Sequence, residues 1–183
     1  MNSSLFDISS YISVHPISLN VAIAIFFAIA LLLLSAFASA SEIAFFSLSP
    51  VDVDALEPDK RPSDKLVQEL RDDNERTLAT ILITNNLVNV AIIMLCNYIF
   101  DSLLTFGVKW LQFLCVTILL TFLLLLFGEI APKVYSRKAP LQFCRRAANG
   151  VLFFRRLFWP IETILLKSGT FAEKVVQKEN RQL

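Results

Sequence analysis

Three groups of polar residues interrupt the apolar stretches of this sequence, and all of them carry oxygen atoms that could bind a cation. The first group is a run of serines at Ser35, Ser39 and Ser41, followed directly by Glu42. Ser35 and Ser39 are four residues apart, so on a helix both hydroxyls project from one face. Serine and alanine at this spacing also let helices pack closely, and packing is the alternative interpretation of this group.

The second group places three amides within five residues, at Asn85, Asn86 and Asn89. Asn85 and Asn89 are again four apart and share a helical face. A single Asn would be enough for a hydrogen bond between two membrane helices. Three of them therefore favour a functional role, because polar groups at membrane depth are costly to bury.

The third group is the segment Phe127-Gly128-Glu129-Ile130-Ala131-Pro132-Lys133. Pro132 cannot donate a backbone hydrogen bond and clashes with the carbonyl of Gly128 in a helix. We therefore expect the helix to break here and to free carbonyl oxygens around Gly128, beside the carboxylate of Glu129. The alternative is that Glu129 is an interfacial charge that pairs with Lys133.

Together these groups offer hydroxyl, amide, carbonyl and carboxylate oxygens, with no thiolate and no histidine among them. Such hard ligands suit Mg²⁺ or Ca²⁺ and argue against Zn²⁺ or copper. A site with one carboxylate would bind its ion modestly, as a transport site must in order to release it. The single histidine, His15, lies before the first predicted span, and we interpret it as an exposed residue.

The elements that must position these groups are membrane helices. Three stretches contain no Asp, Glu, Lys or Arg: residues 8–41, 77–100 and 110–128. About 20 apolar residues are enough for a helix to cross the hydrocarbon core, where the backbone must satisfy its own hydrogen bonds. A chain of 183 residues, 55% of them apolar, is too small to bury three such helices as a soluble domain. We therefore predict an all-α integral membrane protein with three transmembrane helices and further cytoplasmic juxtamembrane helices.

Basic residues predict the orientation of the chain. Residues 1–18 contain no Lys or Arg, the segment 49–76 contains five, the segment 101–109 contains one, and residues 133–183 contain eleven. Basic residues near span ends favour the cytoplasmic side. We predict an external N-terminus and a cytoplasmic C-terminus, and no signal peptide, because no basic residue precedes the first span and its apolar stretch is too long for one.

The same pattern divides the chain into three regions. Residues 1–18 are an external lead-in, and residues 19–132 form the three-span domain with a cytoplasmic loop at 49–76. In that loop we expect a fresh helix start at Ser49, then a solvated helix, capped by Ser63, that continues into the second span. Residues 133–183 mix basic and aromatic residues, which predicts an interfacial helical belt at anionic lipid headgroups, broken at Pro140 and Pro160.

Two further features concern the chain end and the cysteines. The polar residues before Leu183 predict the start of a linker to a cytoplasmic domain. Cys96 and Cys115 fall within spans and Cys144 on the predicted cytoplasmic side, with a spacing that matches no metal or redox motif, so we interpret all three as packing residues.

In this order, the segments Ser35-Ala-Phe-Ala-Ser39-Ala-Ser41-Glu42-Ile-Ala, Asn85-Asn86-Leu87-Val88-Asn89 and Gly128-Glu129-Ile130-Ala131-Pro132-Lys133 resemble the transmembrane domain of the CorC/cyclin M (CNNM) family of magnesium transporters. The resemblance covers roughly residues 19–170. The family often has Gly after the second serine, where this chain has Ala40, so the local helix packing can differ.

The resemblance implies a homodimer in the bacterial inner membrane that exports Mg²⁺, in some members coupled to Na⁺ entry, with regulation by a cytoplasmic CBS domain pair. By position, the ion ligands would be the hydroxyls of Ser35 and Ser39, the amides of Asn85 and Asn89, the Gly128 carbonyl and the Glu129 carboxylate. No nucleic acid partner and no enzymatic activity are expected.

Two other functions remain open at this stage. The chain could be a membrane scaffold of an envelope complex that transports nothing, with the polar groups serving assembly. An intramembrane hydrolase is disfavoured, because no nucleophile has a base within the spans.

Overall fold

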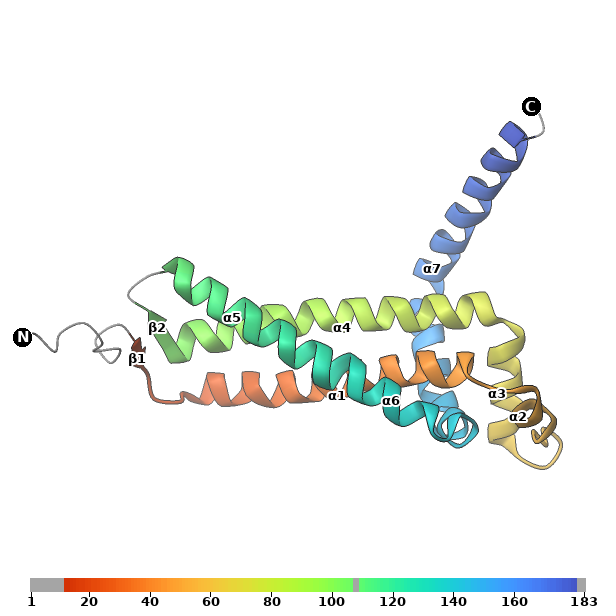
Figure 1. Ribbon diagram of the computed structural model, residues 1–183, viewed down its shortest axis with the longest axis horizontal. Coiled ribbons are helices and arrows are strands. Elements are labelled where there is room, and N and C mark those ends of the chain that lie inside the picture. The colour runs from red at the N-terminus through yellow and green to blue at the C-terminus, as the bar shows by residue number, and fades with distance from the viewer. Residues whose placement is uncertain (1–11, 107–108, 181–183) are drawn as a thin grey trace, which may run out of the picture. The chain divides into compact units, whose positions relative to one another are not determined.

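The computed structural model describes residues 12–106 and 109–180. Its elements in chain order are β1 (Ile12–Val14), α1 (Leu19–Phe46), α2 (Pro50–Asp54), α3 (Pro62–Asp72), α4 (Asn74–Leu103), β2 (Leu104–Phe106), α5 (Lys109–Leu123), the π-helix η2 (Leu124–Ile130), α6 (Ala131–Arg137) and α7 (Pro140–Asn180) (Figure 1). The predicted all-α membrane fold is confirmed. One short antiparallel pair of strands, which the sequence did not suggest, accompanies it.

Three helices are long and apolar enough to cross a membrane: Leu19–Phe46, Asn74–Leu103 and Lys109–Arg137. In the most apolar stretch of each, only 22%, 33% and 17% of the residues are buried within the protein. Side chains this apolar and this exposed need lipid around them, which excludes a soluble helical domain.

The chain forms two compact units, and α1 and α4 contribute residues to both. Unit 1 combines Met1–Ala36 with Asn86–Ala131, and unit 2 combines Phe37–Asn85 with Pro132–Leu183.

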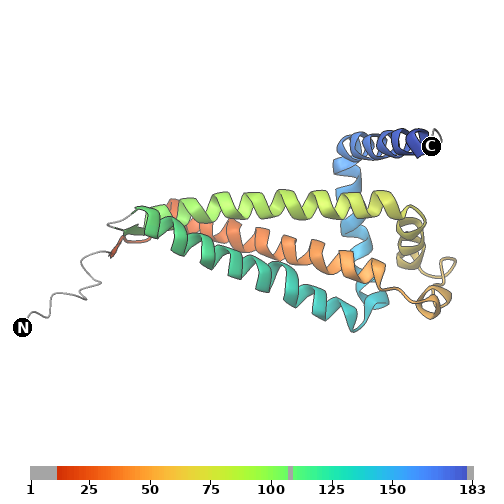
Figure 2. The ribbon, with the colours of Figure 1, turned by 45° about the horizontal axis from the view of Figure 1, so that its top comes forward.

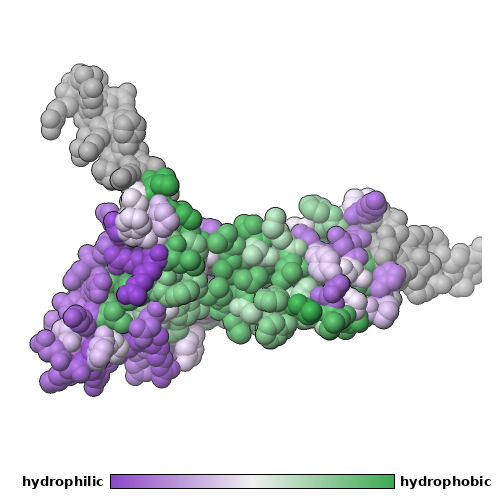
Figure 3. Space-filling model, turned by 180° about the vertical axis from the view of Figure 1, so that it is seen from behind, coloured by the Kyte–Doolittle hydropathy of each residue, from purple (hydrophilic) through white to green (hydrophobic). Residues whose placement is uncertain are grey.

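In unit 1, the first part of α1, the second part of α4, α5 and η2 run alongside one another (Figures 1 and 2). Val21 and Ala24 of α1 pack against Ile99 of α4 in a small apolar cluster. Many outward-facing side chains of this unit are large and apolar, and on the face seen in Figure 3 polar ones gather toward the strands. Those exposed apolar residues include Phe26, Phe27, Leu33, Met94, Phe113 and Phe122.

The two strands join the segment before α1 to the end of α4. They pair antiparallel, with Ile12 opposite Phe106, Ser13 opposite Thr105 and Val14 opposite Leu104. The backbone N–H of His15 donates to the carbonyl of Leu103 at 2.8 Å, which extends the ladder by one residue. Since hydrogen-bonded and non-hydrogen-bonded pairs alternate, Val14 and Leu104 form a non-hydrogen-bonded pair with close Cα atoms.

The third span contains the π-helical segment η2 where the sequence predicted a break. The N–H of Ala131 donates to the carbonyl of Leu126, five residues back, and the chain stays helical from Lys109 to Arg137. The expected break at Pro132 is therefore wrong. A wider turn accommodates the residue, because Pro132 falls in the first turn of α6, where a missing N–H is tolerated.

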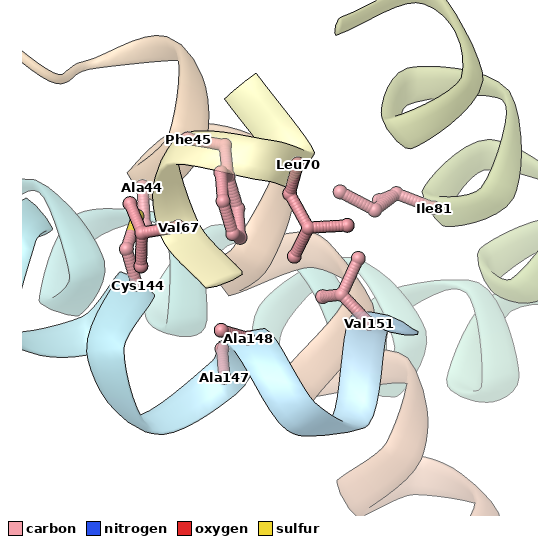
Figure 4. Close-up of a cluster of buried hydrophobic side chains, with 9 residues drawn as sticks. All are labelled: Ala44, Phe45, Val67, Leu70, Ile81, Cys144, Ala147, Ala148 and Val151. Atoms are coloured by element: carbon pink, nitrogen blue, oxygen red, sulfur yellow. The ribbon is translucent and has the colours of Figure 1, made fainter. Parts of the chain in front are cut away.

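Unit 2 is held by an apolar cluster in which α1, α3, α4 and α7 meet (Figure 4). Its members are Ala44 and Phe45 of α1, Val67 and Leu70 of α3, Ile81 of α4, and Cys144, Ala147, Ala148 and Val151 of α7. Small residues let α7 approach closely: a Cβ built on Gly150 would lie 2.7 Å from the ring of Phe37. Burial raises the pKa of the Cys144 thiol to about 12, as expected of a packing cysteine.

The helix starts and stops of unit 2 differ in part from expectation. The fresh start is confirmed, because Ser49 and Asp52 form a capping box around α2. The predicted cap at Ser63 is wrong. Helix α3 begins at Pro62, and the N-cap residue before it, Arg61, makes no side-chain cap. Pro is favoured at the first helical position, which makes a capping side chain dispensable there.

The predicted run of the polar helix into the second span is also wrong. Asp73 has non-helical backbone angles and separates α3 from α4. The Thr77 hydroxyl donates to the carbonyl of Leu70 at 2.6 Å, satisfying one of the acceptors that the break leaves open. Glu69 and Arg71 are exposed as expected, whereas Val67 and Leu70 on the other face of α3 are fully buried.

The C-terminal helix also departs from its predicted division. Pro140 is the first residue of α7, but Pro160 lies inside this helix and does not end it. A proline removes one backbone hydrogen bond and bends a helix without necessarily terminating it. Figures 1 and 2 show α7 as a bent helix.

A buried ion pair ties α3 to α7. The Asp64 carboxylate, with no exposed side-chain surface, accepts hydrogen bonds from Nε and Nη2 of Arg145 at 2.6 and 2.9 Å. It also accepts the backbone N–H of Glu57 at 3.0 Å. Hydrogen bonds from the Arg145 side chain hold the pKa of the Asp64 carboxyl below its ordinary value of 3.8.

Replacing Val14 and Leu104 by cysteine should produce a disulfide on mild oxidation, because their Cα atoms are closely opposed across the ladder. The experiment uses a chain in which Cys96 and Cys115 are alanine and Cys144 remains buried. Mass spectrometry of the tryptic fragments would detect the bond. The out-of-register pair I12C/L104C should stay reduced, and equal oxidation of both pairs would contradict the register.

Asp64→Asn should destabilise the protein by about 3 kcal/mol in thermal unfolding, because Arg145 loses its buried counter-charge. Since the pKa of Asp64 is lowered in the folded state, its contribution is full at neutral pH and disappears as the pH falls through that lowered value. The parent should therefore lose this advantage over D64N only in acid. D59N, which changes an exposed carboxyl, is the control. An equal loss of stability in D64N and D59N would contradict a stabilising role for the Asp64–Arg145 ion pair.

Candidate cation site

Ser35 and Asn89 join the first and second spans within unit 1. The Ser35 hydroxyl donates to the Asn89 amide oxygen at 2.7 Å. Ser35 is fully buried and Asn89 is half-buried. A short hydrogen bond between side chains 54 positions apart in the sequence places this amide against α1, turned away from lipid.

Gly128 brings the third span to the same place. It is buried in η2, and a Cβ built on it would lie 3.1 Å from the Ser35 Oγ atom. A side chain at this position would crowd the serine, and glycine lets the π-helical turn approach it without a shift. Pro132 has no N–H, so it donates no backbone hydrogen bond into the preceding turn. We call the meeting point of Ser35, Asn89 and Gly128 the serine junction.

Ser39 and Asn85 form a second, looser pair within unit 2. The Ser39 hydroxyl lies 3.5 Å from the Asn85 amide oxygen, at the long limit for a hydrogen bond. Ser39 is fully buried and Asn85 is half-buried. Ser39 lies one helical turn from Ser35 on α1, and Asn85 lies one turn from Asn89 on α4, so α1 supplies the hydroxyls and α4 the amides.

Glu129 follows Gly128 in η2 and is half-buried. In the part of the chain that the structure describes, the Ser35–Asn89 and Ser39–Asn85 hydrogen bonds do not involve the Glu129 carboxylate. Lys133, considered above as its partner, instead lies 3.0 Å from Glu42, with Nζ facing Oε2. The interpretation of Glu129 as the partner of Lys133 is therefore not what the structure shows.

Other polar residues of the spans bond to their own helix. Ser41 donates to the carbonyl of Phe37 at 2.7 Å, and Thr84 donates to that of Thr80 at 2.8 Å. Such back-bonding satisfies the hydroxyl locally and is common for Ser and Thr in membrane helices. Asn86 is exposed, so of the three neighbouring amides the structure directs Asn85 and Asn89 to serines.

Sequence reasoning missed two ion pairs, Glu42 with Lys133 and Asp64 with Arg145. Glu42 was noted only as the neighbour of Ser41, although a carboxylate next to an apolar span is a signal for a basic partner. Asp64 carried no signal, because it stands among solvated charges and its partner lies 81 residues further on.

The chemistry of the site is that of neutral oxygen ligands. A hydroxyl oxygen and an amide oxygen each keep lone pairs beyond the hydrogen bond that joins them. In the described ranges, no group of three His, Cys, Asp or Glu side chains could hold a metal ion, so a cation here would rely mainly on hydroxyl, amide and carbonyl oxygens, with Glu129 as the candidate carboxylate. Hard divalent cations accept this ligand set.

Comparison with known proteins assigns the family. The model of the cyclin M transmembrane N-terminal domain matches residues 26–182. A UPF0053 protein from Synechocystis sp. (sll1254) is 30% identical over 133 residues, which is 71% of this chain and 36% of that protein. The chain thus spans about a third of the length of the curated relative that it matches.

This chain belongs to the cyclin M family and comprises the family's transmembrane domain. The family is commonly linked to the transport of Mg²⁺ and other divalent cations. The predicted resemblance is therefore confirmed, and the protein is an integral membrane protein.

Gly128→Ala should destabilise the folded protein by about 1–2 kcal/mol, since its Cβ would come within 3.1 Å of the Ser35 Oγ atom. Ser35→Ala removes that atom, so the double variant should lose less than the sum of the two single losses. A double-mutant cycle of thermal unfolding in detergent measures the coupling. Strict additivity would show that the close approach at the serine junction carries no energy.

Proposed function

We propose that this chain is the ion-conducting domain of a divalent-cation transporter whose cargo is Mg²⁺. The observation that carries the proposal is the serine junction, where three spans of a cyclin M family domain contribute a hydroxyl, an amide and a glycine turn to one point. Buried oxygen atoms at membrane depth are costly unless they serve a ligand, and a hard cation is the ligand that they suit.

The proposed ligands are Ser35, Ser39, Asn85, Asn89, Gly128 and Glu129. When no ion is bound, the Ser35 hydroxyl hydrogen points to the Asn89 oxygen. An arriving cation would compete for both oxygen atoms and turn that hydrogen away. Because only Glu129 carries charge, binding would be modest, which permits release on the other side of the membrane.

We further propose that transport is Mg²⁺ export coupled to Na⁺ entry by alternating access, in a homodimer of the bacterial inner membrane. The N-terminus would face outward, and the basic α7 would lie among anionic headgroups on the cytoplasmic side, followed in the full-length protein by a CBS-type regulatory domain. These parts of the proposal rest on the family and on the distribution of basic residues.

Asn89→Ala and Glu129→Ala should each abolish the stabilisation of the protein by Mg²⁺. A ligand at 100 times its dissociation constant stabilises a folded protein by about 2.7 kcal/mol, which thermal-shift curves with and without Mg²⁺ resolve. The control is Asn86→Ala, which removes an exposed neighbouring amide and should respond to Mg²⁺ as the parent does.

Flux of Mg²⁺ into proteoliposomes, followed with an enclosed indicator, tests transport itself. The parent and N86A should move Mg²⁺, and N89A should not. If the parent is stabilised by Mg²⁺ yet moves none, the chain is a binding scaffold of an envelope complex. If N89A and E129A respond to Mg²⁺ as the parent does, the ion binds elsewhere.

A further inference from the structure

A second polar site lies at the far end of unit 1, beside the strands. It is a cavity of about 470 Å³ between α4 and α5, and we call it the ladder-end pocket. Its lining residues are Asn97, Asp101, Leu104, Lys109, Gln112, Phe113 and Val116. In Figure 3, the polar surface near the strands marks this end of the unit.

The oxygen donors of this pocket resemble those of the serine junction, with a charge added. Asn97 and Asp101 are one helical turn apart on α4 and line the pocket together. Gln112 Nε2 donates to Asp101 Oδ1 at 2.8 Å. A carboxylate has about four acceptor positions, so this bond leaves most of its capacity available.

Unit 1 also contains an apolar cavity of about 230 Å³. From α4 it is lined by Ile92, Cys96, Ile99 and Phe100, from α5 and η2 by Leu120, Leu123 and Leu124, and from α1 by Ile25, Ala28, Ile29 and Leu32. Along α4 these residues follow Asn89 and overlap the segment that carries Asn97. A cavity with such walls stays dry and offers a hydrated cation no ligand.

We propose that the ladder-end pocket is a weak binding site for a divalent cation, with Asp101 as its charged ligand and Asn97 and Gln112 beside it. The proposal rests on the proposed function, in which the ladder-end pocket would be a transient binding site for the ion outside the apolar cavity. Lys109 offsets the charge of Asp101 in the same pocket, so the site holds its ion loosely and keeps its hydration water.

The alternative is that Asp101 only fastens α4 to α5 through Gln112. Asp101→Asn separates the two roles, because the Asn oxygen still accepts the Gln112 hydrogen bond while the charge is lost. The matched control is Asp54→Asn, which removes an exposed carboxylate in unit 2.

The test is terbium luminescence with the full chain in uncharged detergent. In a Trp159→Phe background, Trp110 is the remaining tryptophan, two residues from Gln112. Tb³⁺, a hard cation with oxygen preference, should emit when tryptophan is excited, and millimolar Mg²⁺ should displace it. In D101N the half-saturating Tb³⁺ concentration should rise roughly tenfold, and D54N should match the background chain.

Asn89→Ala, at the serine junction, should leave the Tb³⁺ signal intact. Equal Tb³⁺ affinity in D101N and the background chain, or a signal lost in N89A but kept in D101N, would overturn the proposal. Absent emission would do the same. The proposed function is judged separately by Mg²⁺-dependent stability and flux, so it can fail while a cation site at Asp101 stands.

Discussion

Within hydrocarbon, a polar group must find its partner inside the protein, because no water is there to bond it. Ser41 and Thr84 meet this demand with carbonyl oxygens of their own helix. Ser35 meets it across the domain, with the amide of Asn89. The cross-helix bond is the costlier solution, since it needs two helices held in register, and it marks the place where the family's transport function is proposed.

The close approach of the third span depends on the same demand. Pro132 has no backbone N–H to donate, and the span stays helical there through the π-helical turn η2, in which the Ala131 N–H donates to the Leu126 carbonyl. Gly128, inside that turn, has no side chain to hold η2 away from Ser35. Backbone geometry and residue choice thus agree at the serine junction.

Unit 2 solves a different problem, that of fastening juxtamembrane helices to one another. Its apolar cluster of α1, α3, α4 and α7 supplies the packing, and the Asp64–Arg145 ion pair fixes the position of α7 along α3. Because Asp64 is enclosed and bonded on both oxygens, α7 cannot slide along α3 without exposing an unpaired charge.

The sequence by itself determined the three spans, the helical class and the residues Ser35, Asn89 and Gly128, because uncharged runs and polar residues within them are local signals. Only the tertiary structure decided that Ser35 bonds Asn89, that Lys133 pairs with Glu42, and that Asp64 is buried by Arg145. These partners lie 54 to 91 positions apart in the chain, and no local pattern selects them. The helix break at Asp73 and the π-turn before Pro132 were misjudged for a related reason, since long-range packing there overrides local propensity.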